Sequence, residues 1–220
     1  MADNDHGFSR IQREAACVFA ARSRIEQAAA FCGPDAEEAG RAAAPLLSTF
    51  ADRIDRDRLD GFVIELAHPR HGRDVKAVAA TVRGVLTGLL RAEKDTSTDD
   101  ALDGAADEHW WFRACETRWF VLAFAPCYGP TSPRHGFGSG STYVLLQPVA
   151  SFDRHATPHG EVISEQVKVR IRQEYAASGR PYDTGLAAQD VEALKFVWPL
   201  APGLAPIRWW ENTERPEAVG

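Results

Sequence analysis

The stretch Trp119-Phe120-Val121-Leu122-Ala123-Phe124-Ala125 is almost wholly apolar. Such a run is typical of a central strand that is buried on both faces. Phe112 precedes it, and Glu116-Thr117-Arg118 lies near the turn that would join the two as a β-hairpin. The segment Thr142-Tyr143-Val144-Leu145-Leu146-Gln147 predicts a further strand, which Pro148 stops.

The residues before this hairpin predict mainly helices. Ala-rich segments at 10–31 and 35–57 favour helix, and Asp35 is a plausible N-cap of the second one. Apolar residues recur with a helical period over 74–92, whereas 62–66 is a short β-type segment. A later helix is expected over 161–177. The tail from Trp198 is rich in proline and should be irregular.

These elements predict an α+β fold of one domain spanning residues 1–220. A helical N-terminal half packs on a mostly antiparallel sheet, and residues 1–12 and 211–220 are expected to be flexible. Pro126 to Ser141 is a Pro/Gly-rich loop of about sixteen residues. A loop of this length in a compact domain is usually functional or disordered.

Composition narrows the class of protein. The 220 residues contain 25 Lys and Arg against 31 Asp and Glu, for a net charge of −6, without a basic block. We therefore expect no nucleic-acid partner. No apolar run of ~18 residues could span a membrane, and the polar, acidic first residues do not resemble a signal peptide. Four cysteines without a C-x-x-C pair indicate a reducing compartment, the cytoplasm. The Ala- and Arg-rich composition is consistent with a GC-rich bacterial source.

The densest group of residues with nucleophilic, metal-ligating or cationic side chains surrounds the apolar strand. Its members are His109, Cys115, Cys127, Tyr128, Arg134 and His135. Their intervals match no zinc-finger spacing. Two interpretations stay open: buried structural cysteines with surface histidines, or a large planar cofactor held by aromatic rings, one iron ligand and an arginine.

The order and spacing of several short motifs resemble the YqcI/YcgG family. The motifs are Ala16-Cys17-Val18-Phe19-Ala20, His109-Trp110-Trp111-Phe112, Trp119-Phe120-Val121, Ala125-Pro126, Ser132-Pro133-Arg134, Leu145-Leu146-Gln147-Pro148 and Ser151-Phe152. They are scattered over roughly residues 14–175. Two departures leave the iron ligand open. Ala16 stands where the family usually has proline, and Cys127-Tyr128 stands where many relatives carry a histidine.

The resemblance implies a haem b-dependent N-oxygenase that hydroxylates a guanidine or amine nitrogen of a small, amino-acid-like substrate. Such an enzyme uses O₂ and an external electron donor such as a ferredoxin, and the chain could form a homodimer. A haem-binding or haem-sensing protein without turnover is the alternative. A binding module that has lost the cofactor is a third possibility.

The resemblance also assigns candidate site residues, each of which could instead be structural. Cys17 and His109 are alternative iron ligands, and His135 is the third candidate. Arg134 could pair with a haem propionate. The remaining cofactor-pocket candidates are Trp110, Trp111, Phe112 and Tyr128. Candidates for the carboxylate that orients a cationic substrate are Glu108, Glu116 and Asp153.

Overall fold

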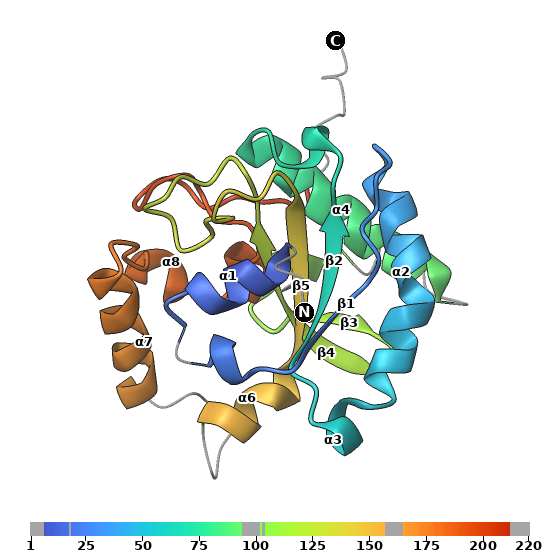
Figure 1. Cartoon of the computed structure of the whole chain (residues 1–220), viewed down its shortest axis with the longest axis horizontal. Helices are drawn as coiled ribbons and strands as arrows, with labels where there is room; N and C mark the ends of the chain where they lie inside the picture. The colour runs from blue at the N-terminus through green and yellow to red at the C-terminus, as the bar shows by residue number, and fades with distance from the viewer. Residues whose placement is uncertain (1–6, 18, 94–101, 103, 157–164, 212–220) are drawn as a thin grey trace, which may run out of the picture.

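A computed structural model of the chain describes residues 7–17, 19–93, 102, 104–156 and 165–211. Its centre is one five-stranded sheet (Figure 1). The strands are β1 (Ile25–Gln27), β2 (Gly61–Leu66), β3 (Phe112–Ala114), β4 (Thr117–Phe124) and β5 (Thr142–Pro148), in the spatial order β1-β2-β5-β4-β3. Only β1 and β2 pair in parallel. The predicted α+β class with a mostly antiparallel sheet is therefore confirmed.

Helices cover both faces of the sheet (Figure 1). The α-helices are α1 (Phe8–Glu14), α2 (Ala36–Ala51), α3 (Ile54–Asp57), α4 (Val75–Ala92), α6 (Val149–Ala156), α7 (Glu165–Ala177) and α8 (Thr184–Ala187). Short 3₁₀ turns are η1 (Ala20–Arg22), η2 (Pro69–His71), η3 (Gly104–Ala106) and η4 (Glu192–Lys195). None of the helices in this described part is long and apolar enough to cross a bilayer.

The alternation of side chains along β2 separates two cores. Phe62, Ile64 and Leu66 join the large core that includes residues of α2 and α4, whereas Val63 joins a smaller core with Phe8 of α1. This division follows from the period of two along a strand. The second face of the sheet thus has the smaller apolar core.

Most of the predicted elements are confirmed. The helix expected over 74–92 is α4, capped by the Asp74 side chain, which accepts the N–H of Ala77 at 2.7 Å. The expected strands are β2, β4 and β5, and the hairpin turns at Cys115 and Glu116. Both turn residues have left-handed backbone angles, φ 51° and 57°. Residues 165–177 of the helix predicted over 161–177 form α7, and 161–164 lie outside the described residues.

The continuous helix expected over 10–31 is wrong. The segment contains the end of α1, the turn η1 and the strand β1. The Oδ2 atom of Asp60 accepts the N–H of Arg24 at 2.9 Å, and β1 then pairs with β2. Pairing with the sheet therefore outweighs the helix propensity of this Ala-rich stretch.

The ends expected to be flexible include part of a helix. Residues 8–12 belong to α1, where Phe8 and Ile11 are buried against the sheet. Residues 1–6 and 212–220 lie outside the described part of the chain.

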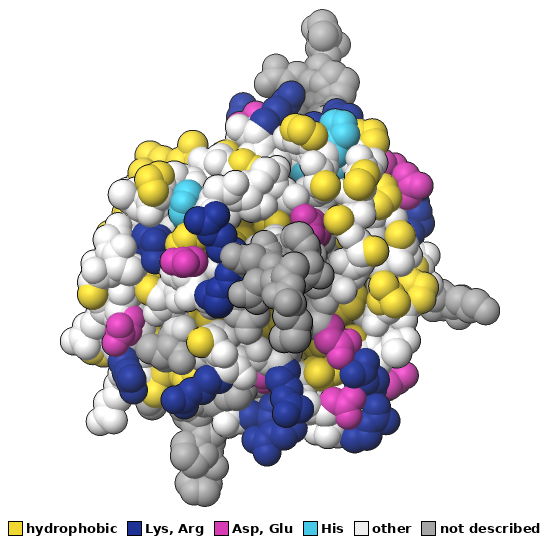
Figure 2. Space-filling view, viewed as in Figure 1, with side chains coloured by type: hydrophobic (Ala, Val, Ile, Leu, Met, Phe, Trp, Pro, Cys, Tyr) yellow, Lys and Arg dark blue, Asp and Glu magenta, His cyan; other side chains and the backbone are white. Residues whose placement is uncertain are grey.

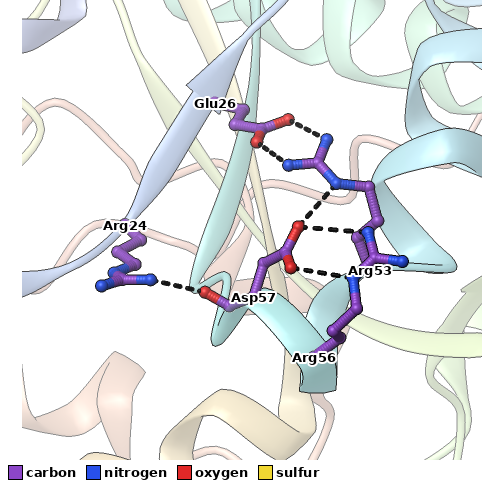
Figure 3. Close-up of polar contacts among 5 residues, drawn as sticks. All are labelled: Arg24, Glu26, Arg53, Arg56 and Asp57. Carbon is purple, nitrogen blue, oxygen red and sulfur yellow. Dashed lines mark hydrogen bonds and ion pairs between the residues drawn. The ribbon is translucent and has the colours of Figure 1, made fainter.

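An ion-pair cluster fixes β1 to the end of α2 and to α3 (Figure 3). Arg53 donates two hydrogen bonds to Glu26, and its Nε donates to Asp57 at 2.7 Å. Arg56 binds the same Asp57 carboxylate, while Arg24 donates to its backbone carbonyl at 2.8 Å. The hydrogen bonds from Arg56 and Arg53 lower the pKa of Asp57 to about 2. Arg53, Arg56 and Asp57 thus link β1 to α3.

Candidate functional site

Cys17 lies in the turn between α1 and η1. Burial raises the pKa of its thiol, whereas the N–H groups of Phe19 and Ala20 and the charge of Arg134 act in the opposite direction. A sulfur anion at this position would thus have two hydrogen-bond donors and a nearby cation. These effects offset only part of the burial, so the pKa of the Cys17 thiol stays raised and the neutral thiol is the favoured form until a metal ion binds the sulfur.

Arg134 is a buried cation without a carboxylate partner among the described residues. Its side chain lies between two rings, with the guanidinium carbon 5.6 Å from the Phe124 centroid and 5.0 Å from that of Trp198. The residue is only 4% exposed. Its Nη2 donates to the carbonyl of Lys195 at 3.2 Å, but its buried Nε has no hydrogen-bond partner. Because an unpaired buried charge is costly, this arrangement calls for an anionic ligand.

The loop that carries Arg134 is held by short-range hydrogen bonds. The N–H of Arg134 donates to the Ser132 hydroxyl at 3.1 Å, and His135 forms an isolated β-bridge with Ala125. The hydroxyl of Tyr128 donates to the carbonyl of Trp198 at 2.9 Å, which ties the loop to the C-terminal segment. The long Pro/Gly-rich loop is therefore anchored at both the strand and the tail.

His135, the third ligand candidate, has a defined tautomer. Its Nδ1 lies 2.9 Å from the carbonyl oxygen of Tyr128. A carbonyl oxygen only accepts hydrogen bonds, so Nδ1 carries a proton, and in a neutral ring Nε2 is then the nitrogen with the lone pair. The His135 ring packs on Phe137 with 5.0 Å between centroids. His135 thus has the tautomer of an iron ligand through Nε2.

Two tyrosines that the sequence did not single out complete the site. The rings of Tyr175 and Tyr182 lie 4.8 Å apart, and Tyr182 packs on Trp198 at 4.9 Å. Burial raises the pKa of both hydroxyls, and both interact electrostatically with Cys17 and Arg134. Tyr175 comes from α7 and Cys17 from the N-terminal segment, so no local spacing in the sequence could have joined them.

The other candidate residues lie elsewhere. His109 is exposed before β3, and its backbone N–H donates to Asp107 at 2.7 Å. Phe112 is buried in the large core, while Trp111 stacks near Arg118 with 6.0 Å to the ring centroid. No described contact joins these three candidates to Cys17 or Arg134. Electrostatic interactions instead link Arg134 with Cys17 and with Tyr128, and His135 is hydrogen-bonded to the Tyr128 carbonyl.

Trp110 also has a structural environment. Its ring lies 6.1 Å from Phe196 and 6.2 Å from Trp209, in the aromatic part of the large core. Among the candidate carboxylates, Glu108 and Glu116 are exposed, and the side chain of Asp153 lies outside what the structure describes.

Cys115 and Cys127 do not share a site. Burial raises the pKa of Cys115 to about 12 and that of Cys127 to about 11, so both stay protonated at neutral pH. Cys115 borders a hollow of about 430 Å³ between α2, α4 and the β3–β4 turn, where its N–H donates to Glu93. These two cysteines fit the structural interpretation rather than a metal site.

Within the described residues, no group of three or more His, Cys, Asp or Glu side chains could hold a metal ion. A haem iron needs only one axial protein ligand, so this result bears on zinc-type centres and leaves the Cys17 site open. Comparison with known proteins finds no matching family model, curated protein or solved structure.

Proposed function

We propose that the chain is a haem-dependent N-oxygenase acting on a guanidine or amine nitrogen of a small, amino-acid-like molecule. One observation carries the proposal: the thiol of the candidate iron ligand Cys17 interacts electrostatically with Arg134, a buried arginine with no carboxylate partner among the described residues. The motif resemblance to the YqcI/YcgG family supplies the reaction class. A haem-binding protein without turnover is the alternative.

Two features of these residues support a haem at this site. The unpartnered Nε of Arg134 is a donor that a propionate carboxylate would accept from, and the planar guanidinium suits a two-point contact. Phe124, Trp198 and Tyr182 supply apolar ring surface around it. When bound, haem supplies the redox-active iron that activates O₂.

The chain's own residues have three tasks in this proposal. Cys17 would bind the iron, and the N–H groups of Phe19 and Ala20 would stabilise the thiolate form in that complex. Arg134 would orient the cofactor by pairing with a propionate carboxylate of the haem. The aromatic rings would exclude water. The sequence has no flavin or nicotinamide fingerprint, so electrons come from an external donor such as a ferredoxin. All four cysteines are free thiols, which fits a cytoplasmic enzyme.

Absorption spectra of the haem-loaded protein test the proposal. Wild type, Cys17→Ala, His109→Ala and His135→Ala are compared as oxidised protein and after reduction under carbon monoxide. The exposed Cys32 provides a matched control, Cys32→Ala. We expect a Soret band with a thiolate signature in wild type and Cys32→Ala, which Cys17→Ala loses.

Turnover separates the enzyme from the haem-binding alternative. Haem-loaded protein is incubated with a reductant, O₂ and a panel of guanidine and amine compounds, and products are followed by mass spectrometry. Addition of one oxygen atom to a nitrogen supports the N-oxygenase. Stable haem binding without any product supports the alternative, and a protein that takes up no haem refutes both.

A further inference from the structure

The hollow that Cys115 borders has the size and the lining of a small-molecule site. Its volume of about 430 Å³ lies within the range of ligand pockets, roughly 300–1,000 Å³. The most deeply buried residues that line it are apolar, since Leu47, Leu89 and Ala114 belong to the large core. Hydrophobic side chains also lie at the surface of α2 (Figure 2), and Leu46 of that helix is 50% exposed. An apolar ligand would therefore find contact area both inside the hollow and on the helix beside it.

The charged side chains that line the hollow are both acidic. They are Glu93, which follows α4, and Glu116 in the β3–β4 turn. No described Lys or Arg lines the hollow, and neither carboxylate forms an ion pair with a described residue. The N–H of Cys115 donates to the Glu93 carboxylate, which fixes that carboxylate beside the turn. An apolar hollow with negative charge fixed at its edge suits a cation that carries an apolar body.

The β3–β4 turn has a costly backbone at the two residues that line the hollow. Cys115 and Glu116 form a two-residue hairpin turn, and both have left-handed backbone angles. Such turns usually contain glycine or asparagine, since other residues cost roughly 1–2 kcal/mol each in this conformation. The turn therefore accepts strain at the positions whose side chains border the hollow, as is common at binding sites.

We propose that this hollow binds a small organic cation, an ammonium group on an apolar body such as an arylalkylamine. The ammonium group pairs with Glu93, and Glu116 supplies a second carboxylate. The apolar body contacts the apolar lining between α2 and α4. The hollow shares no residue with the candidate site around Cys17 and Arg134, and the cation binds without haem. This inference is therefore independent of the proposed function.

Three compounds of similar shape and different charge test the inference on the haem-free protein: phenethylamine, phenylethanol and phenylpropanoate. NMR titration of protein labelled at the Leu and Ala methyl groups gives both the dissociation constant and the place of binding. The neutral alcohol should bind roughly tenfold more weakly than the amine, as expected for a lost charge-assisted hydrogen bond, and the anion should not bind. The methyl signals of Leu47, Leu89 and Ala114 should shift, while those of Leu145 in the smaller core should not.

Two neutral variants test the carboxylates. Glu93→Gln removes the charge but keeps an oxygen that accepts the Cys115 N–H, so the turn is retained. It should bind phenethylamine roughly tenfold more weakly than wild type and phenylethanol equally well. Glu116→Gln, at an exposed position, should weaken amine binding roughly twofold to fivefold, as for a surface ion pair. Glu38→Gln, which is exposed on α2 outside the hollow, is the matched control and should bind as wild type does.

Several results would overturn the inference. One is equal affinity of wild type for phenethylamine and phenylethanol, and another is wild-type amine affinity in a Glu93→Gln protein whose circular dichroism shows it to be folded. Shifts confined to methyl groups away from the hollow would place the amine elsewhere. If phenethylamine, cyclohexylamine and hexylamine all leave the methyl signals of the hollow unchanged at millimolar concentration, the hollow binds no such cation. None of these results bears on the haem spectra, so the two proposals fail separately.

Discussion

Replacing Gly88 by alanine tests how closely α2 and α4 pack. A Cβ atom added at Gly88 would lie 2.1 Å from the carbonyl oxygen of Glu37, and one added at Gly40 would lie 2.1 Å from that of Val85. Both distances are about 1.3 Å short of the 3.4 Å at which ordinary contact begins. The clashing atoms belong to helix backbone, so only a separation of the two helices can relieve the contact.

The expected magnitude follows from two opposing effects. Overpacking a core costs about 1–3 kcal/mol, and a rigid backbone contact lies at the upper end of that range. Alanine in a helix returns about 1 kcal/mol relative to glycine. Gly88→Ala should therefore lower the free energy of unfolding by about 2 kcal/mol, or the melting temperature by roughly 4–8 °C.

Urea unfolding followed by circular dichroism measures this change. Ala80→Gly, at an exposed position of α4, gives the helix-propensity effect alone. The double variant Gly40→Ala/Gly88→Ala should lose less stability than the sum of the single variants, because one separation relieves both clashes. A Gly88→Ala protein as stable as wild type would refute the close approach of the helices.

Three further predictions concern charge and turn conformation. Burial lowers the pKa of His71, so the folded state prefers the neutral ring. The contribution of His71 to the free energy of unfolding should be fully present above pH 6.5 and be lost as the pH falls through the lowered pKa. His71→Gln should remove this acid-side decrease from a profile of melting temperature against pH. The Asp57 carboxyl should titrate at about 2 by NMR, and Arg56→Gln should move it toward the ordinary 3.8; an unchanged pKa would contradict the ion-pair cluster. Glu116→Gly should raise the unfolding free energy by about 0.5–1 kcal/mol, since φ 57° suits glycine, and a loss of stability in urea would argue against that turn.

The site was only partly predictable. Arg134 and Cys17 were selected by resemblance, and the structure places them in electrostatic contact although 117 positions separate them. Tyr175 and Tyr182 carried no local signal in the sequence. That the Nε of Arg134 has no hydrogen-bond partner can be recognised only in the tertiary structure.

The sequence by itself determined the elements whose pattern is local. The apolar run of β4, the helical period of α4 with its Asp74 cap, and the proline that ends β5 all act over a few residues, and each predicted its element. Only the tertiary structure decided that Ile25–Gln27 is a strand, because its hydrogen-bond partners come from β2. It also decided that the charge of Arg134 acts on the Cys17 thiol, because the chain must fold before residues so distant in sequence can interact.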